Sequence, residues 1–233
     1  MNIVVTGASS GIGRETARIL AGMPGNRLVV IARNSMKIQA LAGECNIRMR
    51  ETVMQPVQFD LSKEDPTGLA DIINRRLGKV DVLINNAGAL VNKPFGNYTP
   101  ADLDELFHVN TIAPFMLIQA MLPVFNRQAH VVNIGSMGGV QGSVKFAGLA
   151  AYSASKGALA ILTECLADEL AERKISVNCL AFGSVQTEML ARAFPDYKAP
   201  VSAEDMGTWV ADFALNGHRF FNGKILPVSL STP

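Results

Sequence analysis

Short apolar runs alternate along the chain with longer segments that have helical periodicity. Most of the runs are apolar throughout, which is typical of strands covered by helices on both faces. The predicted strands are Ile3–Thr6, Arg27–Ala32, Val53–Phe59, Val80–Ile84, His130–Ile134, Ser176–Leu180 and Lys224–Leu230. The predicted helices are 12–22, 35–45, 65–78, 101–125, 152–173 and 203–216. This order predicts an α/β fold with a doubly wound, parallel seven-stranded sheet and helices on both faces.

Local signals support two helix starts. Ser35 precedes the second helix, and Thr99 stands before Pro100 at the head of the fourth, where proline suits the first turn. The chain has no internal repeat, low-complexity tract or long polar linker. We therefore expect a single domain over residues 1–233.

Composition narrows the class of protein. Hydrophobic residues make up 48% of the 233 residues and charged residues 18%, so the chain can bury a large core and is not intrinsically disordered. The 21 Lys and Arg residues nearly balance the 20 Asp and Glu residues, which leaves a net charge of +1. Nucleic acid and anionic lipid require clustered basic residues, so neither is an expected partner.

The mean hydropathy of +0.21 raises the question of a membrane span. The most apolar stretch, Val109–Phe125, is shorter than the roughly 20 residues that a span needs. It is also interrupted by polar residues and prolines: Asn110, Pro114, Gln119 and Pro123. A strand pattern already begins at Asn2, so we expect no export signal.

The three cysteines, Cys45, Cys165 and Cys179, are scattered and form no CxxC pair. This pattern indicates neither a disulfide framework nor a metal site, and it favours a reducing, cytoplasmic location.

A glycine-rich segment, Thr6–Gly13, connects the first predicted strand to the first helix. In this context, glycines let the backbone approach a pyrophosphate, and the helix N-terminus offers free N–H groups. The alternative is a tight turn without a ligand. The candidate cofactor residues here are Gly7, Ser9, Ser10, Gly11, Ile12 and Gly13. The segment predicts a Rossmann-type dinucleotide site, although its GxxxGxG spacing departs from the general GxGxxG pattern.

Further motifs follow in order. Asn85–Gly88 reads NNAG after the fourth strand, Asn110 lies in the long helix, Ser136 follows the fifth strand, and Tyr152–Lys156 reads YxxxK. Together with TGxxxGxG they resemble the classical short-chain dehydrogenase/reductase family over about residues 3 to 187. The resemblance implies an oxidoreductase that transfers a hydride between a nicotinamide cofactor and a carbonyl or secondary alcohol in a small molecule.

The end of the second strand bears on the choice between NADP and NAD. No carboxylate follows Ala32, where one would accept hydrogen bonds from a ribose 2′-OH. Arg33 could instead pair with a 2′-phosphate, or it could simply be solvated. NADP-preferring relatives often carry a second basic residue in the glycine loop, where this chain has Ser10. NADP(H) is therefore favoured over NAD(H).

The resemblance assigns further cofactor contacts. These are Asp60 and Leu61 near adenine, Asn86, Ala87 and Gly88 after the fourth strand, Tyr152 and Lys156 of the YxxxK motif, and Val185 and Thr187 near the carboxamide. For Asp60, a turn or helix start is an equally good interpretation.

Tyr152 and Lys156 lie four residues apart, on one face of a predicted helix. A free phenol has a pKa of about 10, and a nearby ammonium lowers it, so that tyrosine can exchange a proton. The resemblance implies that Tyr152 is the general acid/base, that Ser136 holds the substrate oxygen and that Asn110 holds a water in a relay from Lys156. The alternatives are a solvated helix face, a loop serine and a buried structural amide.

Four features depart from the family pattern. Ser136 and Tyr152 are 16 positions apart, a few more than is usual, with the extra length in Gly138–Ala151. Phe182 stands where the family has proline, and only 14 residues, Glu188 to Val201, precede the next helix. The tail Leu226–Pro233 lacks a glycine pair that relatives often have. We expect residues 137–151 and 182–201 to line the substrate side.

The sequence leaves two rival functions. One is an NADP-binding sensor or scaffold protein with little turnover, against which the retention of Tyr152 and Lys156 speaks. The other is an epimerase or dehydratase on the same fold, which the compact chain disfavours. The helices 101–125 and 152–173 are apolar almost all round, and in relatives such helices pair, so we expect a homodimer or homotetramer.

Overall fold

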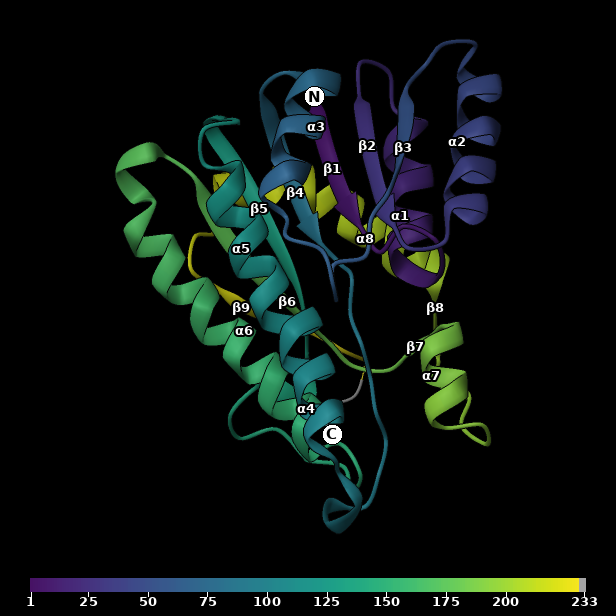
Figure 1. The fold of residues 1–233 in the computed structure, drawn as a ribbon, viewed down its shortest axis with the longest axis vertical. Coiled ribbons are helices and arrows are strands. Elements are labelled where there is room, and N and C mark those ends of the chain that lie inside the picture. Colours follow the sequence, from purple (N-terminus) through teal and green to yellow (C-terminus); the bar gives the residue numbers. More distant parts are fainter. Residues whose placement is uncertain (231–233) are drawn as a thin grey trace.

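The structure, a computed structural model, describes residues 1–230 and contains the predicted parallel sheet. Its seven strands lie in the order β3-β2-β1-β4-β5-β6-β9 (Figure 1). Their bounds are β1 Asn2–Thr6, β2 Arg27–Ala32, β3 Met54–Gln58, β4 Val80–Asn85, β5 Phe125–Ser136, β6 Ser176–Phe182 and β9 Ile225–Val228. The chain winds outward from β1 in one direction and from β4 in the other, so the predicted doubly wound fold is confirmed.

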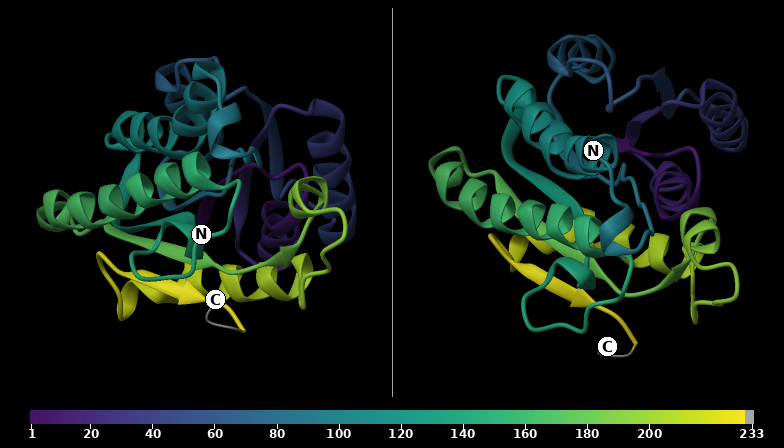
Figure 2. Two further views of the ribbon diagram at one scale, coloured as in Figure 1. Left: turned by 90° about the horizontal axis from the view of Figure 1, so that it is seen from below. Right: turned by 60° about the horizontal axis from the view of Figure 1, so that its bottom comes forward.

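Helices cover both faces of the sheet (Figure 2). One face packs against α1 (Gly11–Ala21), α2 (Ser35–Met49) and α8 (Ala203–Asn216), and the other against α3 (Thr67–Leu77), α5 (Ala113–Met121) and α6 (Ala150–Glu169). Successive strand residues point to opposite faces: in β1, Ile3 and Val5 enter one apolar cluster and Val4 enters the other. This explains why the strands read as continuous apolar runs.

Side-chain caps set two of the helix starts. Thr99 begins α4 (Pro100–Phe107) with a reciprocal capping box to Asp102, as its position before proline predicts. In α2 the cap is one residue earlier than expected. Asn34 accepts a hydrogen bond from the backbone N–H of Lys37, and Ser35 is already the first helical residue.

The prediction of one continuous helix over 101–125 is wrong. After α4 the chain widens into a π-helical turn at His108–Ile112, and α5 follows only from Ala113. Pro114 cannot donate a hydrogen bond to the carbonyl of Asn110 and would clash with it, so a wider turn is accommodated there. The helix ends at Met121, before Pro123, and Phe125 already belongs to β5.

Between β6 and α8 the chain forms small elements that periodicity did not indicate. The strands β7 (Val185–Gln186) and β8 (Val201–Ser202) pair in parallel and bracket the short helix α7 (Glu188–Ala193). The C-terminal strand, β9, ends at Val228, before the predicted end at Leu230. Residues 231–233 of the tail lie outside the described residues. Within the described chain, every helix is too short or too polar to cross a lipid bilayer.

His130 in β5 generates a prediction about acid stability. Its ring is 1% exposed, with Nδ1 3.0 Å from the carbonyl oxygen of Ala214 and Nε2 3.1 Å from Nδ2 of Asn178. Burial lowers the pKa of His130 to about 4. Between pH 6.5 and 4 the unfolded chain therefore binds a proton that the folded chain does not, and the free energy of unfolding falls with falling pH.

We expect this one group to remove up to about 3 kcal/mol of stability by pH 4. Urea unfolding of the parent and of His130→Gln across this pH range measures it. The parent should lose more stability than the variant on acidification, and parallel losses would contradict the assignment.

Candidate active site

The carboxyl ends of four neighbouring strands bring distant segments to one edge of the sheet. Parallel pairing aligns Val5 with Ile84, Asn85 with Asn133, and Ser136 with Phe182. The glycine loop, the NNAG motif and the segments after β5 and β6 therefore leave the sheet side by side. Helix α7 lies beyond this same edge (Figure 1). In doubly wound sheets this is where ligands bind.

A cleft of about 1050 Å³ runs along this edge. Most of the predicted site residues line it: Gly7, Ser9, Ser10, Gly11, Ile12, Arg33, Asp60, Leu61, Asn86, Ala87, Gly88, Ser136, Tyr152, Lys156, Val185 and Thr187. Gly13 and Asn110 do not reach the cleft and lie behind its wall. The predicted residues thus lie together around one cleft, two of them behind its wall.

The glycine loop is held against the end of β4 by Asn86. The side-chain amide of Asn86 donates to the carbonyl oxygens of Thr6 at 3.0 Å and Gly7 at 3.2 Å. The hydroxyl of Thr6 accepts in return from the backbone N–H groups of Asn86 and Ala87. A Cβ on Gly13 would lie 2.1 Å from Nδ2 of Asn86, so the spacing of this loop depends on the absence of that atom.

The loop also presents the free N-terminus of α1 to the cleft. Gly7 and Gly11 have φ values of 67° and 56°, the left-handed region that favours glycine. Ser10 precedes α1 without a side-chain cap, and Gly11 and Ile12 of the first turn line the cleft. Backbone N–H groups at such a helix start suit a pyrophosphate.

Tyr152, in the first turn of α6, is half-buried, and it lines the same cleft as the side chain of Ser136. Burial raises the pKa of Tyr152, and the hydrogen bond with Ser136 opposes part of that rise. The hydroxyl of Ser136 is itself positioned by the backbone N–H of Gly138 at 3.2 Å. The longer loop after Ser136 thus leaves the serine in the same cleft as the tyrosine, and the raised pKa favours the protonated phenol.

Lys156 lies one helical turn after Tyr152 and is only 4% exposed. Its Nζ donates to the carbonyl oxygen of Ile134 at 2.8 Å. Burial lowers the pKa of Lys156 to about 8, and the neighbouring thiol of Cys179 opposes this shift. No carboxylate pairs with this ammonium among the described residues. Its positive charge is therefore available to an anion in the cleft.

Asn110 ties the loop after β4 to α6. Its Oδ1 accepts from the backbone N–H of Ala89 at 2.9 Å, and its Nδ2 donates to the carbonyl of Ala89 and, at 3.0 Å, to the hydroxyl of Ser155. The residue is fully buried within the π-helical turn. These bonds give Asn110 a structural task next to Lys156; its role in a proton relay stays a prediction.

At the other end of the cleft, Arg33 and Asp60 face the space beyond β2 and β3. The carboxylate of Asp60 accepts hydrogen bonds from the N–H of Ser62 at 3.0 Å and its hydroxyl at 2.6 Å. Burial would raise the pKa of Asp60, but these bonds and the charge of Arg33 outweigh it and lower the pKa. Asp60 is therefore both a turn residue and part of the cleft wall.

The sequence patterns did not indicate one of the cations at this end of the cleft. Lys37 lines the cleft next to Arg33 and Asn34. Its position four residues after Arg33, in the first turn of a helix, was the available sequence signal.

The part of the cleft next to Ser136 and Tyr152 contains many apolar side chains beside a few polar ones. It is lined by Leu90, Val109, Met137, Phe146, Leu149, Phe182, Met189, Phe194 and Tyr197. Hydrogen bonds hold the segment around α7 in place: the hydroxyls of Ser184 and Tyr197 are 2.9 Å apart, and Nδ2 of Asn92 donates to the carbonyl of Ala193 at 2.9 Å. Phe182, the residue in place of proline, is buried where β6 meets this wall.

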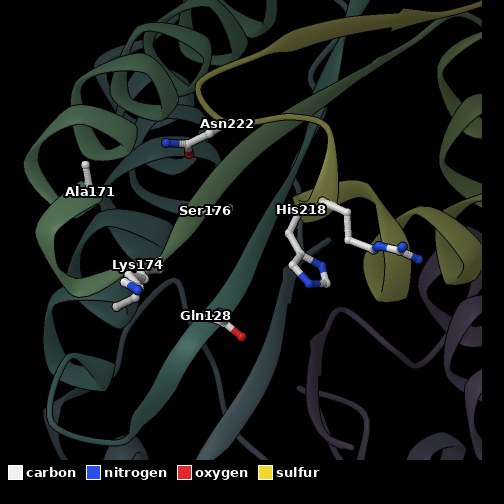
Figure 3. Close-up of a pocket in the computed structure, with 8 residues that line it drawn as sticks. Gln128, Ala171, Lys174, Ser176, His218 and Asn222 are labelled. Atoms are coloured by element: carbon white, nitrogen blue, oxygen red, sulfur yellow. The ribbon is translucent and has the colours of Figure 1, made fainter.

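A second pocket, of about 390 Å³, lies at the opposite end of the strands (Figure 3). Lys174 and His218 flank it from two sides, with Gln128 between them at its lower end in the view. It contains none of the predicted site residues, so the candidate chemistry is confined to the larger cleft.

Comparison with known proteins agrees with this geometry. Residues 1–198 match the profile of the short chain dehydrogenase family. The chain belongs to this family. It is 36% identical over 199 residues to mouse dehydrogenase/reductase SDR family member 7B, covering 82% of this chain and 59% of that protein. It is 34% identical over 192 residues to pig carbonyl reductase [NADPH] 2, covering 81% of this chain and 73% of that protein.

Among solved structures, a short-chain dehydrogenase from Burkholderia cenocepacia in complex with NADP superposes with a TM-score of 0.86. The two chains are 29% identical, and the match covers 97% of this chain and 95% of the other. The chain thus shares its fold with that structure, whereas its match to the mouse protein spans about three fifths of the latter's length.

The contact between Gly13 and Asn86 generates a prediction about stability. Gly13→Ala should destabilise the protein by about 1–3 kcal/mol, because the added methyl group overlaps the Asn86 amide. The matched control is Gly43→Ala in α2, where an added Cβ meets nothing within 4 Å. The control should be stabilising by about 1 kcal/mol, since alanine favours helix. Denaturant unfolding measures both, and equal effects of the two substitutions would contradict the packing described.

Proposed function

We propose that this short-chain dehydrogenase is an NADP(H)-dependent oxidoreductase that interconverts a carbonyl and a secondary alcohol. The observation that carries the proposal is the presence of Tyr152 and Ser136 in one cleft with the buried Lys156, one helical turn after Tyr152. This group lies in the same cleft as the glycine loop. A pure binding protein needs the loop but has no use for a buried ammonium beside a tyrosine.

Each catalytic side chain has a distinct task. When bound, the nicotinamide supplies or accepts the hydride. The hydroxyl of Ser136 holds the carbonyl oxygen beside Tyr152, whose phenol, protonated by virtue of its raised pKa, donates the proton to that oxygen. The charge of Lys156 stabilises the phenolate that remains. Asn110, fixed between Ala89 and Ser155, would hold the water through which the proton is replaced.

NADP(H) is the proposed cofactor. Arg33 lines the cleft after β2, and no carboxylate stands at the end of that strand to bind a ribose 2′-OH. The related chain from Burkholderia cenocepacia is in complex with NADP, and the name of the pig relative specifies NADPH. The glycine-loop residues, Asp60, Leu61, Asn86–Gly88, Val185 and Thr187 would hold the rest of the molecule.

The proposed substrate is a small molecule with an apolar body. Residues 137–151 and 182–201 would form the substrate side, to which Phe146, Phe182 and Phe194 contribute aromatic side chains. Aromatic and aliphatic walls with few polar groups favour ligands of the same character.

We propose that the chain forms a homodimer or homotetramer through α4–α6. Large apolar side chains are exposed on these helices: Leu103, Ile112, Phe115 and Ile161. Such a group on the surface is typical of a protein interface. The second copy would cover these exposed apolar side chains of α4–α6 and leave the catalytic cleft open.

Tyr152→Phe tests the proposal. The variant should lose at least about 10²-fold in kcat, because the positioned proton donor is removed. Its dissociation constant for NADPH should stay within about twofold, since the lost hydroxyl faces the substrate oxygen. The assay follows NADPH absorbance with a panel of aldehydes and ketones, beside calorimetric NADPH binding.

The matched control is Tyr98→Phe, whose hydroxyl bonds only the carbonyls of Val91 and Gly148. It should retain most of the turnover. Substantial turnover by Tyr152→Phe would reject the catalytic assignment, and NADPH binding by the parent without turnover on any compound would favour a sensor or scaffold protein.

A further inference from the structure

The cofactor cleft holds a second cation near Arg33. Lys37 is in the first turn of α2, where the Oδ1 of Asn34 fixes its backbone N–H at 3.0 Å. Both Arg33 and Lys37 line the cleft beyond the end of β2. Their side chains therefore face the same end of the cofactor site from neighbouring positions.

The glycine loop offers no cation to this end of the cleft. Ser10 stands in the loop, and the first basic residue after it, Arg14, is engaged elsewhere. Its guanidinium contacts Glu15 at 2.6 Å and Glu44 at 3.5 Å. A phosphate held by Arg33 would therefore lack a partner from the loop, and Lys37 is the cation placed to supply one.

Lys37 forms an ion pair with a residue of α7. Its Nζ lies 3.3 Å from each carboxylate oxygen of Glu188, the first residue of α7. The two side chains are 49% and 58% exposed, so water competes for both charges and the pair exchanges readily. Because Lys37 and Glu188 both line the cleft, their ion pair bridges two segments of its wall, α2 and α7.

We propose that Lys37 is a specificity-determining residue for the phosphorylated cofactor, and that it exchanges Glu188 for the 2′-phosphate of NADP(H). The inference rests on the proposed NADP(H) binding. A phosphate monoester carries about −1.5 to −2 charges at neutral pH, whereas the Glu188 carboxylate carries one, so the phosphate attracts Lys37 more strongly. NAD(H) has a hydroxyl at that position and leaves the ion pair with Glu188 in place.

The exchange links cofactor choice to the wall of the substrate site. Glu188 begins α7, the helix that contributes Met189 and Leu190 to the cleft. When Lys37 turns to the phosphate, the N-terminal turn of α7 loses its tether to α2, while Asn92 still holds its last residue, Ala193. NADP(H) thus removes one of the contacts at the start of α7, where the Thr187 cap remains, and NAD(H) does not.

The experiment measures dissociation constants of NADPH and NADH by calorimetry, and the quantity compared is their ratio. Lys37→Met should weaken NADPH binding about tenfold relative to NADH, the loss expected for one charge-assisted hydrogen bond. Glu188→Gln should strengthen NADPH binding about two- to fivefold relative to NADH binding, because it removes an exposed ion pair that competes with the phosphate for Lys37. In the Lys37→Met background, Glu188→Gln should no longer change the ratio.

Two controls keep the result specific. Lys37→Arg should restore most of the NADPH preference, and Lys174→Met, at the distant second pocket, should leave the ratio unchanged. Far-UV circular dichroism and thermal unfolding check that each variant folds.

A ratio unchanged by Lys37→Met, or an effect of Glu188→Gln that persists without Lys37, would overturn the inference while leaving NADP(H) as the cofactor. A parent chain that binds neither cofactor, or prefers NADH, would overturn the proposed function and the inference together.

Discussion

The unpaired positive charge of Lys156 is the constraint on which the site depends. Among residues 1–230, it is the one Lys, Arg, Asp or Glu side chain that is buried. A buried ammonium is stable only if something compensates for lost hydration, and here one backbone carbonyl, that of Ile134, accepts from it. Its lowered pKa records the cost of this burial. Because the ammonium has lost hydration, an anion beside it, such as a phenolate, is stabilised more strongly than it would be in water.

The surrounding polar contacts hold α6 so that this charge points into the cleft. Asn85 at the end of β4 donates to Asn133 in β5 at 2.9 Å, and Asn133 donates at 3.0 Å to Thr163 on α6. Asn110 binds Ser155, the residue next to Lys156. These buried bonds connect two strands, the π-helical turn and α6, so the rotation of α6 about its axis is set by more than apolar packing. Tyr152, one turn before Lys156, is oriented by the same network.

Local patterns predicted most of the fold, and nonlocal contacts account for what they missed. An apolar run indicated each strand of the sheet. Motifs at the strand ends indicated the residues of the cleft, since parallel pairing brings those ends together. The interruption of the helix at His108–Ile112 was signalled by Pro114, but apolar periodicity concealed it. Helix α7 is too short for periodicity to show. The ion pair between Lys37 and Glu188 joins residues 151 positions apart, and no single segment contains that information.

The measurement that tests the account most directly is the pKa of Lys156 in the ligand-free protein. NMR titration of side-chain-labelled lysines, with Lys156→Met to assign the signal, isolates this group from the exposed lysines. The account predicts one lysine that titrates near pH 8 and disappears in the variant. If the assigned signal instead titrates near the ordinary value of about 10.4, the ammonium is solvated or paired, and the basis for stabilising a phenolate at Tyr152 is lost.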